Sequence, residues 1–136
     1  MNNIRLMIID DSASARRVFE RMLADWVDIE VVASVDDARK AIEQLPVLKP
    51  DVITLDVEMP GLGGIEALRQ ILEADPEAKV IMLSALTQRG SQTSVQAMEL
   101  GAADVLTKPG LGVSPSEFKK TLYEKLVALA RTPRKS

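Results

Sequence analysis

Five short apolar runs alternate along the chain with five segments of helical periodicity, and this alternation constrains the fold more than any other feature. Three of the runs are almost continuously apolar, which is typical of strands buried on both faces of a parallel sheet. Right-handed crossovers would place helices on both faces of that sheet, whereas a closed eight-unit barrel needs nearly twice the length. We predict strands at Ile4–Ile9, Ile29–Ala33, Val52–Leu55, Val80–Leu83 and Asp104–Thr107.

The 136 residues therefore predict an α/β protein with one domain, a single doubly wound five-stranded parallel sheet. We assign residues 1–131 to this domain. Residues 132–136 are polar and basic without periodicity, and we interpret them as a tail or as the start of an interdomain linker.

The helical segments carry start and stop signals. An apolar stripe that ends at Trp26 predicts the first helix, with Trp26 at its far end, away from any site at the strand ends. We expect the second helix to stop before Pro46, because proline interrupts helices. Ser114 and Glu117 form a capping box at the start of the last helix. The intermediate helices are expected at about residues 36–45, 64–74 and 91–100, the last of them closing at Gly101.

Composition excludes several kinds of chemistry. The chain has no cysteine and no histidine, which removes disulfides, thiolate zinc sites, thiol nucleophiles and imidazole bases. The net charge of −3 and the four aromatic residues argue against direct binding of nucleic acid. No apolar run is long enough to span a membrane and no signal peptide precedes the first strand, so we expect a cytoplasmic protein without a membrane partner.

Polar side chains stand at the ends of four of the five predicted strands. Ligands of open parallel sheets bind outside the carboxyl ends of the strands. Three carboxylates, one hydroxyl and one amine gathered at that edge need a counter-charge, and Mg²⁺ fits because it takes oxygen ligands. Magnesium and lysine together suit phosphoryl transfer, in which a carboxylate can act as nucleophile. The residues are Asp10, Asp11, Asp56, Ser84 and Lys108.

Each of these residues also has an ordinary structural interpretation. Asp10 and Asp11 could cap the first helix. Asp56 alone could belong to a turn, and Ser84 alone is more often a hydroxyl that bonds the backbone. Lys108 alone would usually be a solvated surface lysine. The combination of all five favours a site.

At these positions the sequence resembles a response-regulator receiver domain over about residues 4–130. Within that superfamily it looks most like the regulatory half of the chemotaxis protein-glutamate methylesterase, and less like the stand-alone chemotaxis receiver. The resemblance implies a flavodoxin-like sheet in the order 2-1-3-4-5. The motifs that carry it are Ile8–Ser12, Asp51–Pro60, Leu83–Gln88, Glu99–Asp104 and Thr107–Pro109.

The resemblance also implies roles for the site residues. Asp56 would accept a phosphoryl group from a histidine kinase, and Ser84 would hydrogen-bond the phosphoryl oxygen and move inward on activation. Lys108 would pair with Asp56 or its phosphate, followed by Pro109 in a cis turn. Magnesium would be bound directly by Asp11 and Asp56, through water by Asp10, and by the backbone carbonyl of Glu58.

The resemblance further implies that output passes through the surface formed by the fourth helix, fifth strand and fifth helix. Two departures from the family bear on this switch. Gly63 stands where an acid is common, which would loosen the loop after Asp56. Val105 occupies the position that often holds a switch aromatic, so coupling would rest on Ser84 and on repacking of residues 86–90.

We expect a phosphorylation switch rather than an enzyme in its own right. No catalytic esterase half is present, so the chain would be an excised regulatory domain, whose parent could be a methylesterase, or a lone receiver. The alternative is a magnesium phosphatase of the haloacid-dehalogenase type, with Asp56, Glu58, Ser84 and Lys108 as its superficial match. That class needs an acidic motif after the lysine and a Gly-Thr after the second acid, and both are missing here. Flavin binding is a weaker alternative, because two acids after the first strand would repel a phosphate.

Repulsion within the acid cluster should raise the pKa of at least one carboxyl. On that basis Asp56→Asn is expected to stabilise the metal-free protein at neutral pH.

Overall fold

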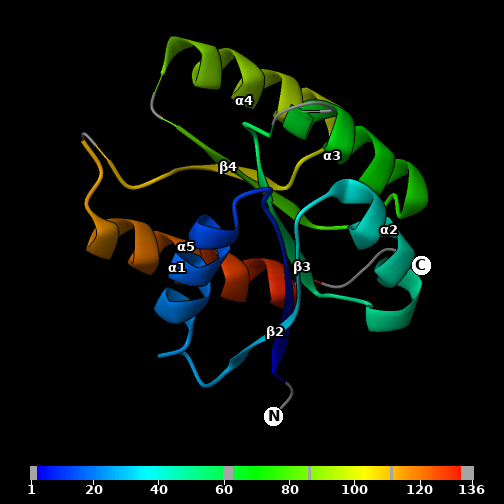
Figure 1. Ribbon diagram of the computed structural model, residues 1–136, viewed down its shortest axis with the longest axis horizontal. Helices are drawn as coiled ribbons and strands as arrows, with labels where there is room; N and C mark the ends of the chain where they lie inside the picture. Colours follow the sequence, from blue (N-terminus) through cyan, green and yellow to red (C-terminus); the bar gives the residue numbers. More distant parts are fainter. Residues whose placement is uncertain (1–2, 60–62, 86, 111, 133–136) are drawn as a thin grey trace.

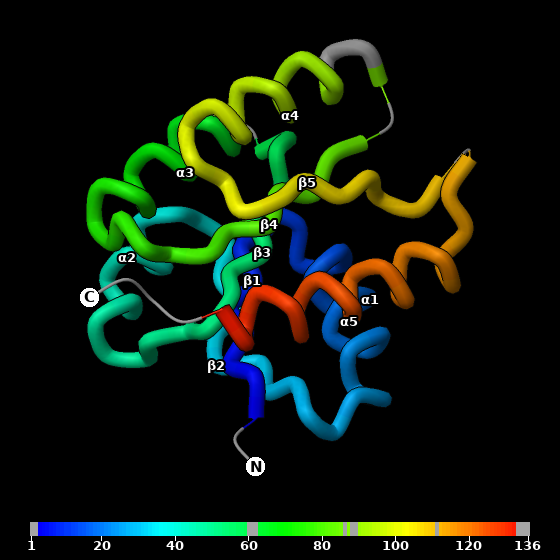
Figure 2. Tube along the Cα trace, turned by 180° about the vertical axis from the view of Figure 1, so that it is seen from behind, coloured from blue at the N-terminus to red at the C-terminus, as the bar shows by residue number. Residues whose placement is uncertain are grey.

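The computed structural model describes residues 3–59, 63–85, 87–110 and 112–132, and their fold is a three-layer α/β sandwich. Its five strands are all parallel and lie in the order β2-β1-β3-β4-β5, as the resemblance implied. Figure 2 shows α1 and α5 on one face of the sheet and α2, α3 and α4 on the other. The strands are β1 Ile4–Ile9, β2 Ile29–Val35, β3 Val52–Asp56, β4 Val80–Ser84 and β5 Asp104–Thr107. The helices are α1 Ala13–Leu23, α2 Ala38–Leu48, α3 Gly63–Ala74, α4 Gln88–Leu100 and α5 Pro115–Arg131.

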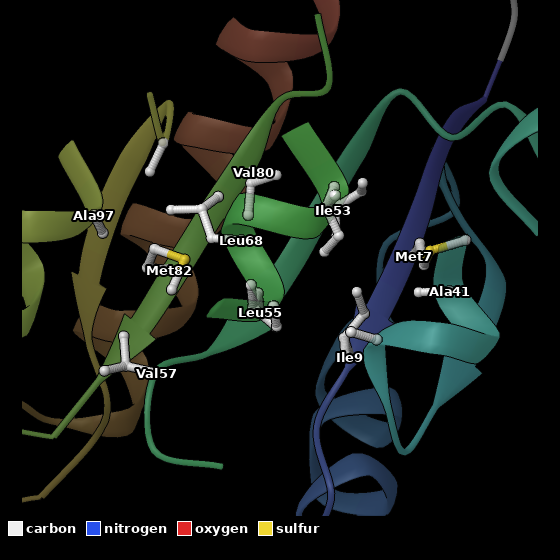
Figure 3. Packing of buried hydrophobic residues seen from close by; sticks show 14 of the residues in the cluster. Met7, Ile9, Ala41, Ile53, Leu55, Val57, Leu68, Val80, Met82 and Ala97 are labelled. Atoms are coloured by element: carbon white, nitrogen blue, oxygen red, sulfur yellow. The ribbon is translucent and has the colours of Figure 1, made fainter. Parts of the chain in front are cut away.

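Two apolar cores hold the layers together. Alternate residues of β1 point to opposite faces, so that Leu6 packs toward α1 and α5 while Met7 packs toward α2 and α3. Figure 3 shows the core on the side of α2 and α3, in which Leu55 and Leu68 meet between β3 and α3. Burial on both faces explains why the central strands read as continuous apolar runs.

The polar residues expected just after two of the strands are the last residues of those strands. β3 extends one residue beyond the predicted run to include Asp56, and β4 likewise includes Ser84. Both residues are buried, at 5% and 3% exposure. Backbone hydrogen bonds between strands hold both ends in place: Val57 N, next to Asp56, donates to Leu83 O (2.9 Å), and Lys108 N donates to Ser84 O (2.8 Å).

Two predicted helix ends were wrong. α1 ends at Leu23, and Trp26 lies beyond it, against Tyr123 of α5 with ring centroids 4.9 Å apart. Trp26 continues the apolar spacing of α1 because its ring packs on α5, although the residue itself lies outside the helix. α2 includes Pro46, because a proline in the last turn deletes only one helical hydrogen bond. Lys49, with φ 48°, then ends α2.

The starts and ends of α4 and α5 follow their sequence signals. Ser114 Oγ accepts from Glu117 N (3.1 Å), which confirms the predicted cap of α5. Gly101, with φ 117°, ends α4 as predicted. α4 begins one turn earlier than expected, because Thr87 caps it by accepting from Gly90 N (2.8 Å). Among the described residues, no helix has the length and apolar character needed to cross a membrane.

Candidate functional site

Three carboxylates converge at the carboxyl edge of the sheet, where β1 and β3 end side by side. Oxygens of Asp10, Asp11 and Asp56 all lie within 4.8 Å of one another. Asp11 is exposed, Asp10 is partly buried and Asp56 is buried. The predicted acid cluster is therefore present, open to solvent on the side of Asp11.

The connection from β1 to α1 holds Asp10 in place. Its carboxylate accepts from Ser12 N (3.0 Å), and its own N–H donates to Val35 O (3.1 Å) on β2. Arg16, one turn into α1, donates to the carbonyl of Asp10 (2.6 Å). The N-cap of α1 is Ser12, whose hydroxyl accepts from Ala15 N. The two acids are thus not the helix cap, and the ordinary interpretation of this pair is wrong.

Asp56 has two hydrogen-bonding partners, and both reach the same oxygen. Lys108 Nζ lies 2.7 Å from Oδ1, and the N–H of Glu58 donates to Oδ1 at 3.1 Å. In the part of the chain that the structure describes, no hydrogen bond reaches Oδ2. The arrangement places both partners on one oxygen of a buried carboxylate and leaves its other oxygen free to react.

Lys108 follows β5 and completes the set from a third strand. Its side chain is about one-third exposed, at 32%, so the lysine closes the site without being buried in it. The cis bond expected before Pro109 is wrong, since no cis peptide occurs in residues 3–59, 63–85, 87–110 or 112–132. The trans form is the intrinsically favoured one, and the chain instead reverses through a bridge between Gly110 and Val113.

Ser84 ends β4 beside Asp56 but does not bond it. The buried hydroxyl donates to Ala85 O at 3.2 Å, which is a long contact. Its partner is therefore a backbone oxygen on the side of α4, and the hydroxyl is held weakly enough to exchange that partner for another.

The surroundings of the cluster raise the pKa of Asp10. Partial burial raises the pKa of Asp10, the Ser12 N–H opposes that rise, and the charge of Asp56 adds to it. Lys108 lowers this pKa and Asp11 raises it, with smaller effects. The expectation that at least one carboxyl of the cluster has a raised pKa is confirmed, with burial as the leading cause and like-charge repulsion behind it.

A hard divalent cation suits this donor set. The three carboxylates carry up to three negative charges against the single positive charge of Lys108. Carboxylate oxygens are the ligands that Mg²⁺ prefers, and it keeps several waters when only one or two carboxylates bind it. The exposed position of Asp11 leaves room for those waters. The side chain of Glu58 is also exposed, and only its N–H has an observed role, on Asp56.

Sequence reasoning misread one residue near the site, Gly63, and missed another, Thr54. Gly63 has a φ of 82°, a left-handed conformation that favours glycine, so its departure from the family pattern reflects backbone geometry. Thr54 lies two residues before Asp56 on β3 and is 1% exposed, and its hydroxyl has no hydrogen-bond partner in the described part of the chain. One threonine within a buried apolar strand was the available signal.

Thr54→Val is expected to stabilise the protein by about 1 kcal/mol or more. A buried hydroxyl without a partner costs about 1–3 kcal/mol, and valine has nearly the same shape. Chemical unfolding of both proteins measures the difference. Ser84→Val is the matched control, because it removes a bonded hydroxyl at a similarly buried position and should destabilise. A loss of stability in Thr54→Val would mean that the hydroxyl is satisfied in solution.

Comparisons with known proteins agree with this geometry. A crystal structure of the response regulator domain of Thermotoga maritima CheB is 38% identical to this chain and superposes with a TM-score of 0.82, covering 97% of this chain and 99% of that one. Protein-glutamate methylesterase/protein-glutamine glutaminase of Idiomarina loihiensis is 39% identical over 132 residues, 96% of this chain and 34% of that protein. The corresponding protein of Pyrococcus abyssi is 40% identical over 134 residues, 97% of this chain and 36% of that protein.

The chain thus spans about a third of the length of these curated relatives. The comparisons give no support to the phosphatase alternative. Residues 6–121 match the family described as "Response regulator receiver domain", which is most of the chain. With its sheet order and its acidic cluster at the strand ends, this protein belongs to the response regulator receiver domain family.

Proposed function

We propose that this protein is a phosphorylation switch in which Asp56 accepts the phosphoryl group. The observation that carries the proposal is the paired state of Asp56, with Lys108 and the Glu58 N–H both on Oδ1. Oδ2 is then the nucleophile. It attacks the phosphorus, an acyl phosphate bond forms, and the bond to the leaving group breaks with its electron pair on that group. The chain has no histidine of its own, so the phosphoryl group comes from a partner histidine kinase or a small acyl phosphate.

The neighbouring side chains supply the charge that phosphoryl transfer needs. Asp10, Asp11, Asp56 and the Glu58 carbonyl would hold Mg²⁺, which neutralises negative charge on the transferring group. Lys108 is close enough to Asp56 to follow its oxygen onto a phosphoryl oxygen. Ser84 would exchange Ala85 O for another phosphoryl oxygen. Catalysis in this reaction is mostly positioning and charge stabilisation, which these residues provide.

The relatives suggest where such a switch acts. They are named protein-glutamate methylesterase/protein-glutamine glutaminase, and this chain aligns with about a third of each. We propose that the receiver regulates a catalytic partner of that kind in chemotaxis.

Asp56→Asn should abolish phosphorylation. Incubation with acetyl phosphate and Mg²⁺ is expected to add one phosphoryl group to the wild type, read by intact mass, and none to Asp56→Asn. Asp51→Asn is the matched control, since Asp51 stands just before β3, at the opposite edge of the sheet, where it accepts from Arg5 N (2.8 Å). Undiminished labelling of Asp56→Asn would refute the assignment.

We further propose that output passes through the face formed by α4, β5 and α5. α4 exposes Val95 (59%) and Met98 (49%), three residues apart on one side of the helix. In a methionine-methyl NMR spectrum, the Met98 signal should shift on phosphorylation. Met7 is fully buried on β1 and serves as the internal control. A Met98 signal that stays in place while Asp56 is fully phosphorylated would exclude α4 from the output surface.

A further inference from the structure

Gly90 lies in the first turn of α4, where that helix meets the end of β4. A Cβ atom added to Gly90 would lie 2.4 Å from Ala85 O and 2.7 Å from Ser84 Oγ. Contacts under 3.0 Å are essentially never made by real Cβ atoms. Gly90 is buried, so the contact is sealed from solvent. No side chain fits between α4 and the Ser84 hydroxyl as they stand.

Backbone conformation does not explain a glycine at this position. Gly90 is inside a helix and is absent from the glycines with positive φ, which in the described chain are Gly63, Gly101 and Gly112. Alanine is a better helix former than glycine at ordinary helical positions. Its N–H caps onto Thr87 Oγ1 (2.8 Å) and its carbonyl accepts from Ser94 Oγ (2.7 Å), as other residues could. What only glycine provides is the space occupied by Ser84 and Ala85.

We infer that Gly90 is a positioning residue that sets where the Ser84 hydroxyl stands and links it to α4. This inference rests on the proposed phosphorylation of Asp56. The hydroxyl is held between Ala85 O, to which it donates, and the bare Cα of Gly90. When the Ser84 hydroxyl turns to a phosphoryl oxygen on Asp56, it leaves the space beside Gly90. The first turn of α4 can then close on the space, so that the position of the hydroxyl and the position of the helix depend on each other.

A methyl group at position 90 must therefore displace the corner between β4 and α4. The tightest contact is with a backbone oxygen, which cannot rotate away as a flexible side chain can. Shifting Ala85 moves Ser84 with it. A misplacement of about 1 Å can slow a reaction by up to about 100-fold. Gly90→Ala should thus slow phosphorylation of Asp56 by acetyl phosphate and Mg²⁺ by about tenfold or more.

The decisive measurement is a double-mutant cycle on that rate. Wild type, Gly90→Ala, Ser84→Ala and the double variant are compared at fixed acetyl phosphate and Mg²⁺. If Gly90 acts through the hydroxyl, the double variant reacts no more slowly than Ser84→Ala, because no hydroxyl remains to misplace. Independent, multiplying effects would overturn the inference, and so would a Gly90→Ala rate within twofold of wild type.

Two glycine controls separate positioning from general damage. Gly110 follows Lys108 by two residues and has nothing within 4 Å of an added Cβ, so Gly110→Ala should keep the wild-type rate. Gly101→Ala strains the other end of α4 through its φ of 117° and should lower stability without a change in rate that depends on Ser84. A wild-type protein that is not labelled at all defeats the proposed function itself, which is a different result from an unaffected Gly90→Ala.

The wild type alone provides a second test should Gly90→Ala fail to fold. On phosphorylation, or with the phosphoryl mimic beryllofluoride and Mg²⁺, the amide signal of Gly90 should shift more than those of Gly101 and Gly110. Loss of the Ser84 contact would change its surroundings, whereas Gly101 sits at the far end of α4. A Gly90 shift no larger than that of Gly101 would overturn the link between the hydroxyl and the helix.

Discussion

Lys108→Ala is expected to lower the free energy of unfolding by about 2–3 kcal/mol when a chelator is present. Removal of one partner of a buried ion pair costs about 3–5 kcal/mol, and the partial exposure of Lys108 reduces that figure. The variant leaves Asp56 buried beside two other carboxylates with only the Glu58 N–H to stabilise its charge. Urea unfolding at neutral pH measures the loss. Protonation of the carboxylates in acid should shrink it.

Lys119→Ala is a closely matched control. Lys119 lies 2.7 Å from Asp25, the same distance as Lys108 from Asp56, and the two lysine side chains are 31% and 32% exposed. The acids differ, since the Asp25 side chain is 74% exposed and that of Asp56 is 7% exposed. A solvent-exposed ion pair contributes little to stability, and the contact of Lys119 with Trp26 adds only a small amount, so Lys119→Ala should lose much less stability than Lys108→Ala. Equal losses in the two variants would show that burial of Asp56 does not matter.

Asp10→Asn is expected to stabilise the metal-free protein at neutral pH and to destabilise it, relative to wild type, in excess Mg²⁺. Lys108 already balances the charge of Asp56. The increase in stability that the sequence led us to expect for Asp56→Asn is therefore expected for Asp10→Asn instead. Asparagine keeps an oxygen to accept from Ser12 N while removing the charge. In wild type, Mg²⁺ at about 100 times its dissociation constant should add about 2.7 kcal/mol. Paired melts with chelator and with Mg²⁺ would show whether the ranking inverts.

Asp10→Asn also tests how the stability of the protein depends on pH. Burial, with the neighbouring carboxylates, raises the pKa of Asp10 above its unfolded value. Its favourable contribution is therefore present below the unfolded pKa and is lost as pH rises through the raised folded pKa. Asp25 behaves oppositely, because the hydrogen bond from Lys119 lowers its pKa and its contribution is lost as pH falls. Without metal, Asp10→Asn should flatten the decline of stability as pH rises through the pKa of Asp10, and Asp25→Asn should not.

The sheet and the gathering of the three acids with Lys108 could be predicted from the sequence because each leaves a local trace. Burial on both faces makes β1 and β4 almost continuously apolar, and strand ends mark where polar residues gather. Trp26 was misassigned because an aromatic ring that packs on a distant helix follows the same spacing as one within its own helix. Pro46 was misassigned because its effect depends on how many turns follow it.

Pairwise geometry left no such trace. Nothing in the sequence indicates that Lys108 reaches Oδ1 rather than Oδ2 of Asp56, or that the first turn of α4 approaches Ser84 closely enough to require Gly90. Both facts depend on contacts between segments far apart along the chain or across a corner. They are settled only when the helices pack on the sheet.

The two helices of the proposed output face, α4 and α5, bury very different amounts of apolar surface against the sheet. α5 buries Phe118, Leu122 and Leu126, each contributing about 1.5–3 kcal/mol. Among the described side chains of α4, only that of Ala97 is fully buried, and α4 lies at the outer end of its layer (Figure 1). A shift of α4 along the sheet therefore disturbs less buried apolar surface than a shift of α5 would, and we expect its cost to be small. That cost is comparable to the roughly 1.5–3 kcal/mol of a single hydrogen bond to a charged oxygen, so one new bond at Ser84 is enough to change the populations of two α4 positions while α5 stays in place.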